Sequence, residues 1–522
     1  MCQYFFKFYD DDFVKLTKNT KIYLSVKYFS VKGCKKQKRP ISYNVRLPRR
    51  VQKGRSLMNA IITELIKIIK DSRDNISREE NLKKYLEELN CHLVGKALEE
   101  IDKELAAEYG KDGWRVERRD ERIVQTSYGF VRAKRRLMKK DGQKPIYPLD
   151  KELGVRTYQR YSAYFEFIVA KLGAKSVYRV TAEAINTLTP ITISHSQVGR
   201  IIKKVGNRYA EWEKVKEIND DAHNSPKRVN VLYIEGDALM IKGQNKNKME
   251  LHRFQVAEGV VQIGRRRILE GVHYVAEFNY DDAKEEISNY IANHYDLNNT
   301  VVITNSDGGL GYGKNVFDEI IGMAKRHEHF RDRYHVNRKN KERIGWAGKR
   351  LECELKRAIS SFSWKKVTIV LSKIKLIAVD DLQLEQIERL RDYLWRNWNY
   401  LASMRERGLS DYEKIIGTCE SNHRIYSYRM KKQGRRWGKF GGRCMAKVIT
   451  GIKNNDLREA LIAKEEFFEH KPSQNFKNAV RNALKKCKHK IHEAVSHGRI
   501  FVNAPTTSSI GQLEKIFHST SW

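Results

Sequence analysis

A short apolar run that contains two acids constrains this chain most. Val231-Leu-Tyr-Ile-Glu-Gly-Asp237 is followed by Ala238-Leu-Met-Ile241, which together are too short and too rich in β-branched residues for a helix. The run therefore predicts a buried strand that carries Asp237. One explanation for this charge is a strand-end aspartate bound by backbone N–H groups. The other is a functional carboxylate, and two more acids downstream favour it.

The charge of the chain limits its partners. Its 522 residues contain 101 Lys and Arg against 64 Asp and Glu, which gives a net charge of +37. A surplus of this size indicates an anionic polymer, because neutralising phosphates releases condensed counterions. We therefore predict a polyphosphate as the partner. The alternative is a soluble protein that is basic but binds no anionic polymer.

The cysteines and the hydropathy pattern indicate where the protein works. Seven scattered cysteines without a C-x-x-C pair predict neither a disulfide framework nor a zinc ribbon, and they are typical of a reducing cytosol. The sequence contains no run of about 18 apolar residues, so no membrane span is predicted. The start of the chain lacks the order of a signal peptide. We predict a cytoplasmic protein, associated with the nucleoid and not with a membrane.

The first third of the chain divides into regions of different character. Residues 1–57 are aromatic and basic without periodicity, which predicts a poorly ordered extension. An amphipathic pattern begins at Met58, so 58–110 is predicted to be helical. Residues 111–150 contain two arginine-rich arms around Ser127-Tyr-Gly129, which predicts a β-hairpin. A ribbon that contacts phosphates and a solvated sheet edge are both compatible with its charge.

Residues 151–228 predict a set of short helices. The pattern indicates a helix around Tyr161–Leu172, a second over Ser176–Leu188, and a third that begins after Ser194, a good N-cap. The third helix should bury Val198, Ile201 and Ile202. Its exposed residues, predicted to bind DNA, are His195, Gln197, Arg200, Lys203 and Lys204. Two helices around a tight turn predict a helix-turn-helix, with an ordinary helical hairpin as the alternative.

Residues 229–338 predict the first part of an α/β core. An amphipathic helix, Asp281–Tyr295, is expected to be capped by Asp281 or Asp282. Asp307 comes just after the strand that follows this helix. The strands expected after the opening one are Leu251–Val261, Arg267–Phe278, Thr300–Thr304 and Phe330–Val336.

The remainder of the chain predicts helices. Residues 339–412 have a helical pattern that interrupts the core. Residues 413–445 contain a basic helix that starts at about Gly417, with Thr418 or Ser421 as its cap. Glu420 falls in its first turn, where the helix dipole favours a negative charge. The basic C-terminal region 446–522 should contain the helices Ala446–Phe468 and Asn475–Ser496.

Three acids far apart in the chain can meet at one edge of the predicted sheet. Asp237, Asp307 and Glu420 would repel one another there, so the site would be stable chiefly with divalent cations. Two oxygen-ligated ions, Mg²⁺ or Mn²⁺, can activate an attacking hydroxyl and stabilise the departing oxygen of a phosphodiester. The expected chemistry is in-line attack on DNA phosphorus, first by water and then by a DNA 3′-hydroxyl.

Four motifs carry a resemblance to a known family: Tyr233-Ile-Glu-Gly-Asp237, Thr304-Asn-Ser-Asp-Gly309, Asp332-Arg-Tyr-His-Val336 and Gly417-Thr-Cys-Glu-Ser-Asn-His-Arg424. From about Met58 to near Gly511 the chain resembles the Lre-type bacterial insertion-sequence transposases, formerly an uncharacterised protein family. The pattern of Glu420, Ser421 and Arg424 also resembles the Mutator-like DDE transposases.

The resemblance implies an RNase H-like catalytic core with a helical insertion before the glutamate. Asp237, Asp307 and Glu420 would be the catalytic and metal-binding triad. The protein would cut at the ends of a mobile element and join them to target DNA. It should act as a homo-oligomer, because two ends must be held together.

Other acids compete for these roles. Glu235 lies two residues before Asp237 and therefore on the same strand face, so it is an alternative ligand or a residue that supports one. Asp332 and His335, on the expected fifth strand, could lie near the metals. A structural histidine is the alternative for His335. His423 with Cys419 lacks the two further ligands that a zinc site needs.

Basic residues after Glu420 are predicted to face the DNA backbone. Trp437 could stack on an unpaired base, and burial in the core is the alternative. The basic residues are Arg424, Arg429, Lys431, Lys432, Arg435 and Arg436. The function that follows from these patterns is a metal-dependent DNA transposase. An RNase H-like nuclease without strand transfer and a DNA-binding regulator without catalysis are the alternatives.

Overall fold

The computed structural model describes residues 49–220, 226–264, 266–309, 311–412 and 417–463, together with Phe467. The expected extension before Arg49 and the expected helix Asn475–Ser496 lie outside these residues. The chain divides into two compact units, Met1–Glu88 and Leu89–Trp522. Each unit is described by itself.

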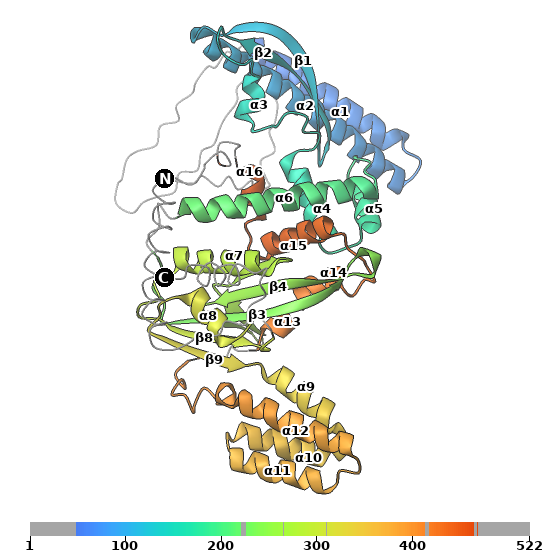
Figure 1. Ribbon diagram of the computed structural model, residues 1–522. Coiled ribbons are helices and arrows are strands. Elements are labelled where there is room, and N and C mark those ends of the chain that lie inside the picture. Colours follow the sequence, from blue (N-terminus) through green and yellow to red (C-terminus); the bar gives the residue numbers. More distant parts are fainter. Residues whose placement is uncertain are drawn as a thin grey trace, which may run out of the picture. The chain divides into compact units, whose positions relative to one another are not determined.

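The described part of the first unit is helical. It comprises α1 (Arg49–Asp71) and the first part of α2 (Asn75–Lys111), which continues into the second unit (Figure 1). Asp74 caps α2, because its Oδ1 accepts the N–H groups of Ile76 and Ser77 at 2.8 and 2.9 Å. Helix α1 begins at Arg49, before Met58, where the predicted helical pattern begins.

The predicted hairpin is confirmed at the start of the second unit. Strands β1 (Arg115–Thr126) and β2 (Gly129–Lys139) are antiparallel and joined by a two-residue turn. Helix α2 packs closely on β2 at Gly95, where a Cβ would lie 2.3 Å from the carbonyl oxygen of Arg132. Only glycine permits this approach. A short helix, α3 (Pro148–Glu152), follows the hairpin.

The three helices predicted next are also confirmed: α4 (Ala163–Gly173), α5 (Tyr178–Leu188) and α6 (His195–Asp220). Ser194 caps α6, because its Oγ accepts the N–H of Gln197 at 3.2 Å. Gln197 Oε1 in turn accepts the N–H of Ser194 at 2.8 Å. The residues predicted to be buried in α6, namely Val198, Ile201 and Ile202, are buried.

A five-stranded mixed sheet lies at the centre of the second unit, so the fold is α/β. Its strands are β3 (Val231–Lys242), β4 (Lys248–Ala257), β7 (His273–Glu277), β8 (Val301–Ser306) and β9 (Arg326–Arg331). The spatial order is β7-β4-β3-β8-β9. Strand β4 is antiparallel to both neighbours, whereas β3, β8 and β9 are parallel to one another.

Helices cover the two faces of this sheet. On one face, α7 (Tyr280–His294) and α8 (Lys314–Ile321) pack on apolar residues of the strands that include Leu232 and Ile234. These residues alternate with Tyr233, Glu235 and Asp237 of the opposite face. The burial pattern confirms the predicted strand.

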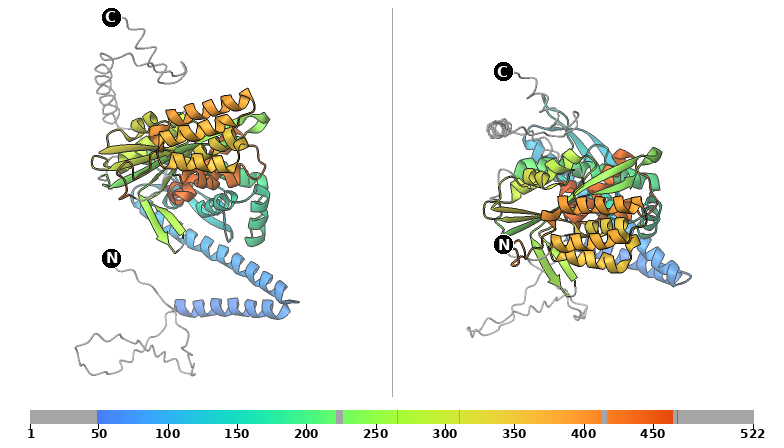
Figure 2. Two further views of the ribbon diagram at one scale, coloured as in Figure 1. Left: turned by 90° about the horizontal axis from the view of Figure 1, so that it is seen from below. Right: turned by 60° about the horizontal axis from the view of Figure 1, so that its bottom comes forward.

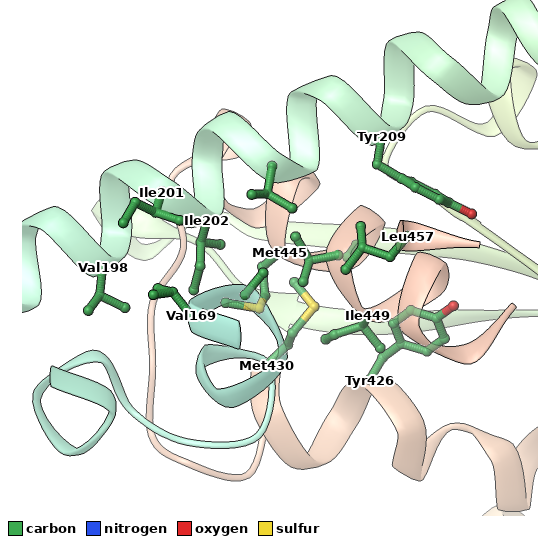
Figure 3. Packing of buried hydrophobic residues seen from close by; sticks show 14 of the residues in the cluster. Val169, Val198, Ile201, Ile202, Tyr209, Tyr426, Met430, Met445, Ile449 and Leu457 are labelled. Atoms are coloured by element: carbon green, nitrogen blue, oxygen red, sulfur yellow. The ribbon is translucent and has the colours of Figure 1, made fainter. Parts of the chain in front are cut away.

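A second cluster of buried residues joins the helical layer α4–α6 to the end of the chain. Figure 3 shows Val169 of α4 and Ile202 of α6 beside Met430 and Met445, which come from α14 (Arg424–Met430) and α15 (Lys439–Lys453). Segments more than 200 residues apart in sequence therefore share one core. This cluster also includes Leu239 and Ile241 of β3.

Two of the predicted strands are divided. The run Leu251–Val261 contains the end of β4 and the start of β5 (Gly259–Ile263). Strand β5 pairs with β6 (Arg266–Glu270) in a separate hairpin. The run Arg267–Phe278 breaks at Gly271, whose φ of 56° turns the chain between β6 and β7.

The predicted fifth strand is displaced along the sequence. Strand β9 ends at Arg331, and Asp332 is the N-cap of α9 (Arg333–Ile344), because its Oδ1 accepts the N–H of Tyr334 at 3.0 Å. Placing Asp332 and His335 on a strand was therefore wrong, since a capping aspartate starts a helix there. Similarly, the N-cap of α7 is Asn279, and the prediction of Asp281 or Asp282 as the cap was wrong.

The helical pattern predicted for residues 339–412 is confirmed. After α9 come α10 (Lys349–Ser360), α11 (Trp364–Leu376) and α12 (Asp381–Arg396), which lie side by side in Figure 2. These helices share their own apolar core, which includes Leu355, Leu371 and Leu390.

The last described helices are shorter than predicted. The basic helix is divided into α13 (Cys419–Asn422) and α14, and the next into α15 and α16 (Leu457–Ile462). Asn455, with a φ of 61°, lies at the second break. Among the described residues, no helix is long and apolar enough to cross a membrane.

Candidate active site

The parallel strands bring Asp237 and Asp307 to the same edge of the sheet. Gly236 of β3 pairs with Ser306 of β8, and each aspartate is the next residue in its chain. Neighbouring strands are about 4.8 Å apart. Ser306 also pairs with Arg331 of β9, so Asp332 follows at the third position of this row. Three aspartates therefore follow three neighbouring strand positions.

Asp237 is only 8% exposed and is held by two hydrogen bonds. Its Oδ1 accepts the N–H of Ala238 at 2.7 Å, and its Oδ2 lies 2.7 Å from His423 Nε2. His423 Nδ1 lies 2.5 Å from Arg253 Nη1. Because a guanidinium can only donate, Nδ1 accepts, and Nε2 carries the proton that His423 donates to Asp237.

Asp307 begins the loop after β8. Its Oδ1 accepts the N–H of Gly309 at 2.7 Å. The guanidinium of Arg331 lies against Gly308, where a Cβ would be 1.2 Å from Nη1 and the φ is +76°. Glycine is therefore required beside Asp307. In the part of the chain that the structure describes, no Lys or Arg forms an ion pair with Asp237 or Asp307.

Glu235 is buried and bound to the start of α13. Its Oε1 accepts the N–H groups of Gly417 and Thr418 at 2.9 and 3.2 Å, and its Oε2 accepts that of Cys419. Burial raises the pKa of Glu235 to about 7, although the three N–H groups act in the opposite direction. Since its two oxygens accept three backbone N–H groups and the residue is only 2% exposed, Glu235 is better suited to support the site than to bind a metal.

Glu420 is the second residue of α13, which packs on β3. Its side chain lies outside the described part of the chain. The backbone on either side of it is tied to β3, through Cys419 and Glu235 before it and through His423 and Asp237 after it. The helix that carries the third predicted acid therefore lies on the strand that carries the first.

Asp332 and His335 lie near this edge, but they belong to α9. The N–H of Asp332 donates to the carbonyl oxygen of Ser306 at 2.8 Å. His335 Nε2 is 3.7 Å from Asp332 Oδ2. The negative charge of Asp332 also contributes to the raised pKa of Glu235. Asp332 therefore lies close to Ser306 and Glu235, although the secondary structure of Asp332 and His335 was predicted wrongly.

The basic residues predicted to bind DNA have different environments. In α6, His195, Arg200 and Lys203 are exposed. Gln197 takes part in the helix cap, and Lys204 forms an ion pair of 2.6 Å with the buried Glu166. Arg424, Lys431, Lys432 and Arg436 are exposed, and Arg435 is half-buried.

The prediction that Arg429 faces DNA is wrong. Arg429 is 1% exposed, and its Nε donates to the carbonyl oxygen of Gly173 at 2.8 Å. Its guanidinium lies between the rings of Tyr178 and Trp437, 5.2 Å from each. Trp437 is buried as well and donates to the carbonyl oxygen of Met430. The alternative of burial therefore holds for Trp437, because this side of α14 packs on the helical layer.

Three further residues at the site are absent from the predicted set: Arg253, Gln255 and His423. Arg253 pairs with Asp237, and Gln255 pairs with Glu235, across the antiparallel strands β3 and β4. The strand alternation could have indicated the first two, because polar residues inside an apolar strand need a partner. Nothing in the local pattern marks His423 as a neighbour of Asp237.

The donor set suits a hard cation. Among the described side chains, no three His, Cys, Asp or Glu groups come close enough to hold a metal ion. Asp237 and Asp307 supply two carboxylates on adjacent strands, and Glu420 is the candidate for the third. Carboxylate oxygens without a fixed Lys or Arg partner are the ligands that Mg²⁺ and Mn²⁺ prefer. Asp237 and Asp307 are therefore candidates to hold such an ion.

Comparison with known proteins gives two matches. Residues 76–466 match the model of an uncharacterised protein family, UPF0236. The chain is also similar to the "UPF0236 protein in vanSb 3'region" of Streptococcus gallolyticus. The two are 32% identical over 457 residues, which cover 87% of this chain and 99% of that protein.

Proposed function

The chain belongs to the uncharacterised protein family UPF0236, and we propose that it is the DNA transposase of a bacterial insertion sequence. It would bind the ends of the element, cut the DNA strands there and transfer them to a target. The site for both reactions would be the edge of the sheet that carries Asp237 and Asp307. Glu420 would complete the triad.

The observation that carries this proposal is the strand register. The pairing of Gly236 with Ser306 makes Asp237 and Asp307 neighbours, and within the described chain neither forms an ion pair with Lys or Arg. Two adjacent carboxylates repel each other, so a structural role alone would not favour this arrangement. A divalent cation bound between the two carboxylates would remove the repulsion and would explain why they lie side by side.

The order of the strands supports an RNase H-like core. Such a core has three antiparallel strands, a helix, and two further strands parallel to the first. Here β3, β4 and β7 are followed by α7, β8 and β9 in that arrangement. The helices α9–α12 would be the insertion before the glutamate.

The proposed chemistry needs two Mg²⁺ or Mn²⁺ ions, which when bound would activate the attacking hydroxyl and stabilise the leaving oxygen. Asp237 and Asp307 would hold them through carboxylate oxygens. His423 would keep the Asp237 carboxylate in one orientation by donating its Nε2 proton. Asp307 would be oriented by the N–H of Gly309.

The basic surface supports DNA as the substrate. The net charge of +37 would attract the protein to DNA. The protein would therefore associate with the nucleoid in the cytoplasm. Helices α5 and α6 would form a helix-turn-helix. Its second helix, α6, would contact DNA through exposed residues such as Arg200 and Lys203. A homo-oligomer would hold two ends at once.

The test is an assay with labelled DNA that contains the inverted repeats flanking the gene. With Mg²⁺, the wild-type protein should produce both cleaved ends and joined products. Asp237→Asn should abolish both, while its DNA affinity stays within about three-fold of wild type, about 0.7 kcal/mol. Cleavage without joining would indicate a nuclease, and binding without either product would indicate a regulator. Wild-type activity in Asp237→Asn would remove Asp237 from the site.

A further inference from the structure

We propose that Glu235, Gln255 and His423 form an anchor that fixes α13, and with it Glu420, relative to Asp237. The anchor residues would be positioning residues for the reaction. This inference rests on the proposed function for its catalytic consequence, and on the hydrogen bonds around α13 for its structural part.

Glu235 holds the start of α13. Its two oxygens accept three successive backbone N–H groups, those of Gly417, Thr418 and Cys419. The first N–H groups of a helix have no partner within the helix, and a carboxylate satisfies them well. Glu235 is 2% exposed, so its own charge also depends on these bonds. Each partner therefore stabilises the other.

Gln255 binds both ends of the same short helix. Its Nε2 donates to Thr418 Oγ1 at 2.6 Å, and its Oε1 accepts from Asn422 Nδ2 at 2.9 Å. Gln255 lies opposite Glu235 on the neighbouring strand β4, and both residues are 2% exposed. The anchor thus involves both β3 and β4.

His423 holds the end of α13. It lies between α13 and α14, and it connects Asp237 of β3 with the buried Arg253 of β4 through its two ring nitrogens. The positive charge of Arg253 faces Nδ1, which leaves the Nε2 proton for Asp237. His423 therefore links the chain after Glu420 to the carboxylate of Asp237.

The anchor is needed because α13 is short. Four residues form a single helical turn, which is too short to be stable alone. The chain reaches it only after the long helical segment α9–α12, so the position of α13 on the sheet depends on long-range contacts. Side-chain bonds to β3 and β4 supply such contacts before and after Glu420.

The structural part can be tested by amide hydrogen exchange in the full-length protein without metal or DNA. Glu235→Gln replaces one acceptor oxygen by an N–H donor, so the amides of Gly417, Thr418 and Cys419 should exchange at least about ten-fold faster, because about 1.4 kcal/mol of protection is lost. The matched control is Asp456→Asn, another buried acid, which hydrogen-bonds to Tyr209 Oη. Exchange at residues 417–419 should not change in this control.

The catalytic part can be tested with the strand-cleavage assay. Glu235→Gln and His423→Ala should lower kcat by about 10- to 100-fold, the usual effect of removing a group that orients a ligand. DNA affinity should stay within a few-fold of wild type. His423→Gln should recover part of the activity, because its amide can still donate to Asp237. Asp456→Asn should cleave at the wild-type rate.

The outcomes separate the two proposals. Unchanged exchange at residues 417–419 in Glu235→Gln would overturn the anchor, whatever the protein does to DNA. Wild-type cleavage by His423→Ala would overturn the positioning role and leave the transposase intact. If wild-type protein cleaves no DNA while Glu235→Gln exchanges faster, the anchor stands as structure and its catalytic role falls with the proposed function.

Discussion

Two groups of carboxylates in the second unit differ in how their charge is balanced. In the first, Glu213, Glu277 and Glu286 surround Lys447, whose Nζ lies 2.5, 3.2 and 2.6 Å from their oxygens. Lys447 is 1% exposed, and Arg443 adds a second cation on Glu277. The chain itself provides the positive charges in this group.

The second group lies at the edge formed by β3 and β8. Asp237 and Asp307 have hydrogen bonds to His423 and to backbone N–H groups, but no ion pair with Lys or Arg within the described residues. The comparison teaches that burial of acids is not by itself a sign of function. The group around Lys447 joins α6, α7 and α15 to β7, whereas the second group has no ion pair of this kind among the described residues.

The largest expected effect is on the first group. Lys447→Met leaves three glutamates without their common cation, so the free energy of unfolding should fall by about 3–5 kcal/mol. Chemical denaturation monitored by circular dichroism measures it. Lys439→Met, an exposed lysine of the same helix, should change stability by less than about 0.5 kcal/mol. Equal stability of the two variants would contradict a structural role for Lys447.

A smaller effect is expected for a buried acid whose partner is neutral. Burial raises the pKa of Asp456 to about 6, and Tyr209 Oη donates to it at 2.8 Å. As the pH rises from about 4 to 6, the unfolded state loses this proton first, so the folded state is progressively destabilised.

Asp456→Asn removes this pH dependence. The difference in unfolding free energy between wild type and variant should therefore shift in favour of the variant by up to about 3 kcal/mol between pH 4 and pH 7. Denaturation curves across this range measure it. A difference that does not vary with pH would show that Asp456 titrates normally in the folded protein.

The smallest expected effect concerns the second group. Mn²⁺ at 100 times its dissociation constant should stabilise the wild-type protein by about 2.7 kcal/mol. Asp307→Asn should lose most of this stabilisation, because one of two adjacent ligands is gone. Asp456→Asn should keep it. Thermal unfolding with and without Mn²⁺ distinguishes the two, and equal stabilisation of both variants would contradict a metal site at Asp307.

Local patterns predicted much of this fold. The strand around Asp237, the hairpin at Gly129 and the cap at Ser194 are all as expected, because periodicity and capping are properties of neighbouring residues. Two errors arose where a single residue changes the local structure. Gly271 divides one expected strand, and Asp332 starts a helix in place of another.

The environment of the site was less predictable, because it depends on contacts between distant segments. The burial of Arg429 follows from how α14 packs on α4 and α5. The contact of His423 with Asp237 follows from how the chain returns to the sheet after α12. The neighbourhood of Asp237 and Asp307 could be anticipated, since parallel strands bring their carboxyl ends to one edge.

The most direct test of the account is crystallography of the full-length protein soaked in Mn²⁺, with anomalous scattering to locate the ion. Anomalous density is expected in contact with the carboxylates of both Asp237 and Asp307. The same crystals of Asp307→Asn should lack it. Density elsewhere only, or an ion that remains in place in the variant, would contradict the claim that these two acids form a metal site.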